Sequence, residues 1–161
     1  WLPENAAAWD QPIKPEVYAT ADILGRLVER HAGSLGELKV GDPPQAIPSL
    51  QPIDGVASED ENWTLEVRRG ETVAARVMVR RQEGFDAEIP FGNEFSGRNA
   101  THGVYVDNIG LNGLRIVANS NEREFFLTAD RIATPGKRSF FLTADVDGKV
   151  TTHPITVEVL P

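Results

Sequence analysis

From residue 63 to the end of the chain, apolar and polar residues alternate in short runs separated by turn residues. Residues 72–80 place valine or alanine at every second position, and residues 155–160 alternate in the same way. A period of two residues is typical of an antiparallel strand with one buried face. Turn signals recur about every eight to twelve residues, a spacing that favours two packed sheets. The pattern therefore predicts an all-β, antiparallel two-sheet sandwich of seven to eight strands.

Two turn signals divide the last part of this region. Residues 134–137 read Thr-Pro-Gly-Lys, and Asp147-Gly148 is a strong signal for a two-residue hairpin turn. The hexapeptide Phe-Phe-Leu-Thr-Ala-Asp occurs at residues 125–130 and again at residues 140–145. A structural repeat needs a longer period and more copies. We interpret the two copies as strands in similar surroundings.

Residues 1–61 have a different character, because they hold seven of the eleven prolines. Proline fixes its own φ angle and biases the preceding residue towards extended conformations. Residues 41–53, where four of these prolines stand, are therefore expected to form an extended connector. We predict an N-terminal arm over residues 1–61 and a sandwich domain over residues 62–161.

The arm contains one segment with helical spacing, at about residues 15–32. Pro15 suits a first helical turn, and Gly33 is placed to end the helix. Apolar residues recur at steps of three and four, which predicts an amphipathic helix. A helix of this length cannot bury its apolar stripe alone, so we expect it to pack against a partner or another domain. The stripe comprises Val17, Tyr18, Ala21, Leu24, Leu27 and Val28.

Composition excludes several classes of function. The net charge of −8 disfavours binding to nucleic-acid phosphates, which requires a basic face. No run of eighteen apolar residues is present, so we expect no transmembrane segment. The chain has no cysteine, which removes disulfides, thiolate catalysis and cysteine–zinc sites. We expect no cofactor.

Partner-binding candidates come from the arm and from the first two strands of the sandwich. Arg68, Arg76 and Arg80 share the outward parity of their strands, so a basic stripe on one sheet face would suit an acidic protein or a polyanionic glycan. A solvated face that keeps the sheet soluble explains the same arginines. The full set of candidates is Trp1, Trp9, Tyr18, Leu24, Leu27, Arg68, Arg76 and Arg80.

One short motif suggests a metal. Asp145 and Asp147 alternate before a glycine, as at the start of a calcium loop. The twelfth position of such a loop needs glutamate, and Thr156 stands there. A hairpin turn explains the same residues without calcium. No nucleophile–base motif or metalloprotease motif is present, so we expect no catalytic residue and no enzyme.

Residues 84–129 resemble a known group of modules. The features concerned are a loop that ends in Gly103-Val104, a polar strand opened by Glu122-Arg123, and the later Pro135-Gly136 turn. They resemble immunoglobulin-like modules of large exported planctomycete-type bacterial proteins, found beside pre-peptidase C-terminal domains. More loosely, they are similar to the NPCBM-associated immunoglobulin-like domains of bacterial glycosidases. The resemblance covers about residues 64–160.

This resemblance implies an immunoglobulin-like sandwich, a modular parent protein and a periplasmic or extracellular location. Its motifs are structural, so it transfers no active residue. We therefore expect a non-catalytic structural or protein-interaction module that contacts a protein partner or neighbouring domains. The alternative is a carbohydrate-binding module that uses exposed aromatic residues, such as Tyr105, Phe91 or Phe95, on a sheet face or in the loop at residues 92–101.

Overall fold

The computed structural model describes residues 11–58, 61–91, 100–106 and 113–161. These residues form thirteen strands and no helix. The chain divides into two compact units, of which one ends at Pro43 and the other covers Pro44–Pro161. This boundary lies well before the division expected at residues 61 and 62.

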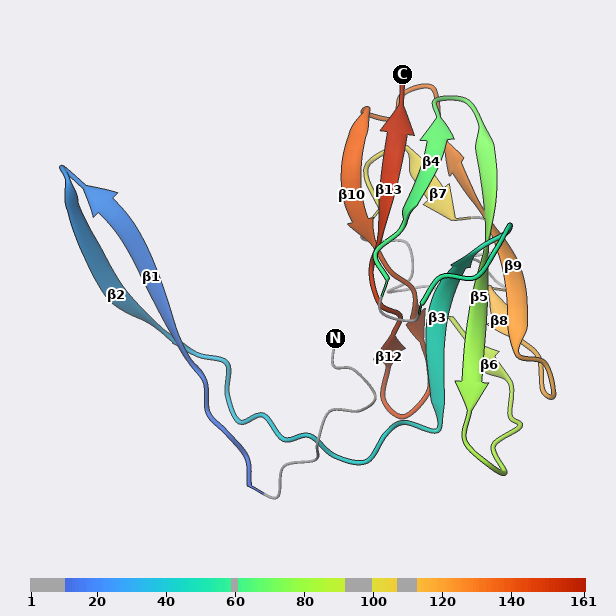
Figure 1. Ribbon diagram of the computed structural model, residues 1–161, viewed down its shortest axis with the longest axis horizontal. Helices are drawn as coiled ribbons and strands as arrows, with labels where there is room; N and C mark the ends of the chain where they lie inside the picture. Colours follow the sequence, from blue (N-terminus) through green and yellow to red (C-terminus); the bar gives the residue numbers. More distant parts are fainter. Residues whose placement is uncertain (1–10, 59–60, 92–99, 107–112) are drawn as a thin grey trace. The chain divides into compact units, whose positions relative to one another are not determined.

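The first unit is a β-hairpin, so the helix predicted at residues 15–32 is wrong. Strand β1 (Glu16–Ile23) pairs antiparallel with β2 (Arg26–Ser34) (Figure 1). The physical reason is visible in β1, where small apolar residues at odd positions alternate with polar or aromatic ones at even positions. This period of two matches a strand, and it competes with the helical spacing that the same apolar residues also satisfy.

The turn of this hairpin is held by an unusual pair. Ile23 opposes Arg26, so Leu24 and Gly25 form a two-residue loop. Their φ angles are 52° and 77°, and two positive values are typical of a type I′ turn. The Asp22 carboxylate accepts a hydrogen bond of 2.8 Å from the Gly25 N–H. Glycine adopts this conformation readily, whereas leucine does so at an energetic cost.

The second unit is a β-sandwich with a four-stranded and a three-stranded sheet. The order is β3-β5-β9-β7 in the larger sheet and β10-β13-β4 in the smaller one (Figure 1). Neighbouring strands pair antiparallel except β4 and β13, which are parallel. These strands are β3 (Ala46–Pro52), β4 (Thr64–Arg68), β5 (Thr72–Arg81), β7 (Val104–Val106), β9 (Glu122–Ala129), β10 (Gly136–Phe140) and β13 (Ile155–Leu160).

Two short strand pairs complete the described part of the sandwich. The strands β6 and β8 pair with each other, as do β11 and β12, and each strand is two residues long. All-β architecture with mostly antiparallel strands agrees with the alternation in the sequence. The bounds are β6 (Ile89–Pro90), β8 (Arg115–Ile116), β11 (Thr143–Ala144) and β12 (Val150–Thr151).

A single hydrophobic core joins the two sheets. Phe125 of β9 and Phe140 of β10 are buried, and their rings stack with centroids 6.3 Å apart. They open the two copies of the repeated hexapeptide; the first copy lies in β9 up to Ala129, whereas the second begins at the end of β10 and continues into β11. Val77 of β5 and Val157 of β13 belong to the same core. The inward residues are those that the period of two selects.

The extended connector predicted at residues 41–53 is wrong for most of its length, because Ala46–Pro52 form β3 of the sandwich. This strand pairs with β5 along its whole length, from Ala46 opposite Arg81 to Pro52 opposite Ala75. Proline cannot donate a ladder hydrogen bond, but an edge strand with one neighbour tolerates it. Strand β3 is such an edge, and its Leu50 is buried in the core. The sandwich therefore begins before Trp63.

Candidate interaction surface

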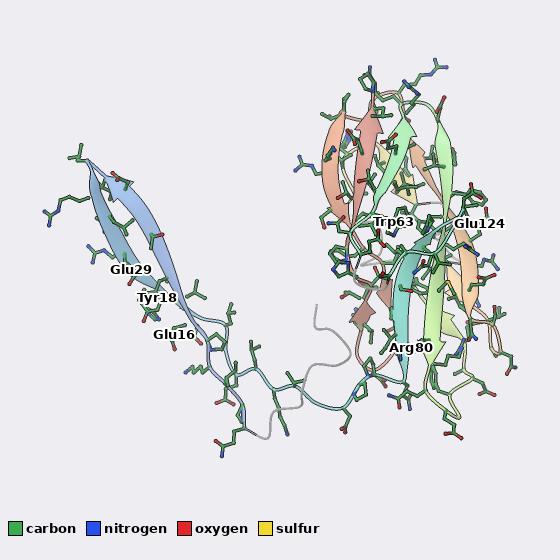
Figure 2. All side chains as sticks on the ribbon, in the orientation of Figure 1. Glu16, Tyr18, Glu29, Trp63, Arg80 and Glu124 are labelled. Carbon is green, nitrogen blue, oxygen red and sulfur yellow. The ribbon has the colours of Figure 1, made fainter. Side chains whose placement is uncertain are left out.

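The hairpin presents two chemically different faces, which follow from its register. Tyr18 opposes His31, and Thr20 opposes Glu29, on one polar face. The rings of Tyr18 and His31 meet edge to face with centroids 5.3 Å apart, and the His31 imidazole also pairs with the Glu16 carboxylate. Figure 2 labels Glu16, Tyr18 and Glu29 on this unit. Their contacts order the polar side of the hairpin.

The opposite side is apolar along β1, whereas β2 places Arg26 and Arg30 on it, opposite Ile23 and Ala19. Odd-numbered residues of β1 alternate with the polar face, and Val28 of β2 lies opposite Ala21. Val17 and Ile23 are exposed, and Ile23 keeps 54% of its surface accessible. We call this set the apolar hairpin face: Val17, Ala19, Ala21, Ile23 and Val28.

An exposed apolar face on a two-stranded hairpin is unusual. Such hairpins are marginally stable in water unless they pack against other structure. Each strand also has only one strand neighbour among the described residues, so a backbone edge is available on both sides. Contiguous apolar surface combined with open strand edges is typical of an interaction site.

The structure places the arm candidates on this hairpin. Tyr18, Leu24 and Leu27 are exposed, and Leu24 at the tip is 99% accessible. They lie on a hairpin rather than along one helical stripe, and Leu27 opposes Asp22 on the polar face. Trp1 and Trp9 lie outside the described residues. The apolar hairpin face was not predicted, although the strict alternation of residues 17–23 indicates it.

The predicted basic stripe is wrong, because its arginines occupy different sheets. Arg68 ends β4 in the three-stranded sheet, whereas Arg76 and Arg80 belong to β5 in the four-stranded sheet. Alternation along β5 does put Arg76 and Arg80 on one outer face. Figure 2 labels Arg80 of β5 and Glu124 of β9 on the sandwich.

Arg76 has a structural role. Its guanidinium donates hydrogen bonds of 3.3 Å to the carbonyls of Pro52, Ile53 and Gly55, and it lies 3.6 Å from the Glu122 carboxylate. These contacts hold the turn after β3 against the outer face of β5. A charge that is engaged in this way is less accessible to an acidic ligand.

The turn after β3 is fixed by two further side chains. The Gln51 amide bonds both the N–H and the carbonyl of Ala57, at 2.8 and 3.0 Å. The Trp63 indole donates a hydrogen bond of 3.2 Å to the Leu50 carbonyl and packs against the core. Trp63 is therefore an anchor of the sandwich.

The calcium candidate Asp147 lies in a turn, and Asp145 directly follows β11. Asp147 and Gly148 have φ angles of 46° and 84°, and the Lys149 N–H bonds the Val146 carbonyl at 2.9 Å. The Asp147 carboxylate accepts a hydrogen bond of 2.6 Å from the Gln45 N–H, which ties the start of β3 to this turn. Within the described ranges, no group of three histidine, cysteine or acidic residues is arranged to hold a metal.

Exposed aromatic residues gather on the outer face of the four-stranded sheet. Tyr105 of β7 opposes Thr128 of β9, and Phe126 lies two residues away on the same face. Their accessible fractions are 52% and 38%. Phe91, which we expected to be exposed, is buried in the core, and Phe95 lies outside the described residues. Phe126 was not among the predicted residues, although the alternation that buries Phe125 turns Phe126 outwards.

No helix in the part of the chain that the structure describes is long and apolar enough to cross a bilayer.

No family model and no curated protein matches the sequence. Among solved structures, the chain is similar to a family 123 glycoside hydrolase from Clostridium perfringens, with 13% identity, a TM-score of 0.46, and coverage of 72% of this chain and 27% of that chain.

Two further solved structures are similar in the same way. One contains domains 4 and 5 of the S-layer protein SbsC, with 16% identity, a TM-score of 0.37, and coverage of 84% of this chain and 63% of that chain. The other contains the fibronectin(III)-like modules of CbhA from Clostridium thermocellum, with 13% identity, a TM-score of 0.34, and coverage of 92% and 62%. The chain spans less than two thirds of the length of each of these three structures.

Proposed function

We propose that this chain is a non-catalytic, immunoglobulin-like β-sandwich module that attaches to a protein partner or to neighbouring domains through its N-terminal hairpin. The observation that carries the proposal is the apolar hairpin face, which the hairpin by itself leaves exposed. Burying apolar surface contributes roughly 25 cal/mol per Å², so a partner that covers this face gains stability from each valine and isoleucine.

The sandwich supports this role as a scaffold. A four-stranded sheet packed on a three-stranded one is the arrangement of immunoglobulin constant-type domains. The polar side chains that drew attention in the sequence, Arg76 and Asp147, hold turns in place. We infer a role in spacing or docking within a larger exported bacterial protein or assembly, located in the periplasm or outside the cell, as the resemblance of residues 84–129 implies.

Site-specific crosslinking tests the hairpin as an attachment element. The chain has no cysteine, so Ala21→Cys introduces a single thiol on the apolar hairpin face for a photoactivated crosslinker. The matched control is Glu83→Cys, an exposed position in the turn after β5. In cells that naturally make the protein, we expect a discrete adduct from the residue 21 thiol and none from the residue 83 thiol. Equal labelling from both positions would contradict the proposal.

A second candidate function is carbohydrate binding, which the exposed pair Tyr105 and Phe126 favours. Aromatic rings on a flat sheet face can stack on sugar rings. Titration with a glycan library would show binding that is lost in Tyr105→Ala and Phe126→Ala but kept in Val117→Ala, a substitution of another exposed apolar residue. Absence of any binding at millimolar glycan would exclude this candidate.

A further inference from the structure

We propose that the partner of the hairpin is a second copy of this chain, and that β1 of one copy adds to the sheet edge formed by β10 of the other. This inference rests on the proposed function, because it names the occupant of the same surface. Both segments are exposed within one copy: every residue of β1 is exposed, as are the first four residues of β10.

Both strands have an open edge. Among the described residues, β1 pairs only with β2, and β10 lies at the end of its sheet beside β13. An edge strand presents unpaired N–H and carbonyl groups, which can pair with a strand from another molecule. Main-chain hydrogen bonds supply affinity in such strand addition, and side chains supply its specificity.

The charges of the two edges are complementary. Strand β1 contains Glu16 and Asp22 and no basic residue. Strand β10 contains Lys137 and Arg138 and no acidic residue. Strand β2 carries Arg26, Glu29 and Arg30 with His31, so it offers mixed charge. Opposite charges on neighbouring strands stabilise pairing, whereas like charges oppose it. The chemistry therefore selects β1 for the β10 edge.

The faces of the two strands also agree. Lys137 lies on the outer face of its sheet, where it pairs with Glu158 at 3.1 Å, and Phe140 belongs to the opposite, inward face. If the polar face of β1 continues the outer face, either Glu16 or Asp22 lies beside Lys137, because the strand separates these two carboxylates by about 20 Å. The same orientation turns the apolar hairpin face towards the side of Phe140. This placement pairs one β1 carboxylate with Lys137 and turns the apolar residues of β1 towards Phe140, on the side that Arg138 also shares by parity.

Such a contact joins two different surfaces of the same chain. A heterologous contact of this kind closes into a ring or continues as an open array, depending on the rotation between copies. The predicted state of the purified full chain is therefore a concentration-dependent oligomer. Its association weakens as salt rises, because part of the attraction is between exposed charges.

Sedimentation analysis of the full chain tests this proposal by charge reversal. The edge variant Lys137→Glu/Glu158→Lys reverses the charge at position 137 of β10 while keeping the ion pair between positions 137 and 158. The arm variant Glu16→Lys/Asp22→Lys reverses β1. Each variant should weaken association by about tenfold or more, since like charges across an interface repel. The chain that carries all four substitutions should recover affinity to within about threefold of the original.

Two matched controls locate the contact. Glu29→Lys replaces one acidic residue of β2 by lysine (Glu29 is labelled in Figure 2), and Arg68→Glu reverses a charge on β4, the far edge of the sheet that contains β10. Both should leave association unchanged. Misfolding of either double variant cannot produce recovery in the fourfold variant, so this recovery keeps the test decisive.

Three outcomes would overturn the proposal: a monomeric full chain from micromolar to millimolar concentration, association insensitive to both reversals, or no recovery in the fourfold variant. A monomer whose residue 21 thiol still crosslinks to a different protein would leave the proposed function standing and refute only the second copy. A monomer without such an adduct would refute both.

Discussion

The assignment of β3 to the sandwich predicts a large effect from a residue that the proline-rich pattern would place in a connector. Leu50 is 4% accessible and belongs to the core, and its carbonyl accepts the Trp63 indole hydrogen bond. Leu50→Ala removes buried methyl groups and leaves a cavity. Substitutions of this kind cost about 2–5 kcal/mol, and near-complete burial places Leu50 within that range.

Urea unfolding of the full chain measures this cost. Trp1→Phe and Trp9→Phe leave Trp63 as the single fluorescent tryptophan, and its contact with Leu50 makes it a direct reporter of the β3 region. The matched control is Ile53→Ala, just after β3, where the side chain is 38% accessible and the cost should stay below about 1 kcal/mol. A Leu50→Ala cost no larger than that of Ile53→Ala would refute the placement of β3 in the core.

Three further predictions follow from the backbone and the unit boundary. A chain of residues 44–161 should unfold cooperatively, whereas residues 62–161 should be much less stable by urea titration because β3 is missing; equal stability would contradict the boundary. Leu24→Asn should stabilise the hairpin by about 0.5–1 kcal/mol, measured as slower amide exchange, because asparagine suits φ values near 52°. Faster exchange would contradict the turn geometry. Gly103→Ala should lower the stability measured by thermal unfolding by about 2–5 kcal/mol, because the added Cβ would lie 2.9 Å from the Ala133 backbone. The control Gly84→Ala, at a similar φ but with open space around it, should lower the stability by about 1–2 kcal/mol. Equal losses would exclude the close approach at Gly103.

Period-two alternation was sufficient to predict the sandwich, because one buried face forces every second residue to be apolar. It failed where other constraints decide. Strand β3 was not predicted, because Pro48 and Pro52 are compatible with a strand only at a sheet edge and the sequence does not give the strand order. The hairpin was not predicted from Leu24-Gly25, because leucine is a rare first residue of a type I′ turn.

The candidate site was only partly predictable for related reasons. The exposed arm residues Tyr18, Leu24 and Leu27 were selected from a helical stripe, although their exposure arises from a hairpin. Arg68 and Arg76 were grouped by parity, but parity does not say which sheet a strand joins. Phe91 shows the same limit, because its burial depends on a long-range contact of its N–H with the Leu114 carbonyl and on core packing around it.

Amide hydrogen exchange over residues 16–34 tests the role of the hairpin most directly. The measurement compares the dilute full chain with the same chain in its native assembly. An isolated hairpin should exchange rapidly, since two strands alone are marginally stable, and docking should protect its amides by about tenfold or more. Protection confined to β1, β2 and the strand edge that receives them is the predicted result. Equally rapid exchange in both states would contradict the hairpin as the attachment element.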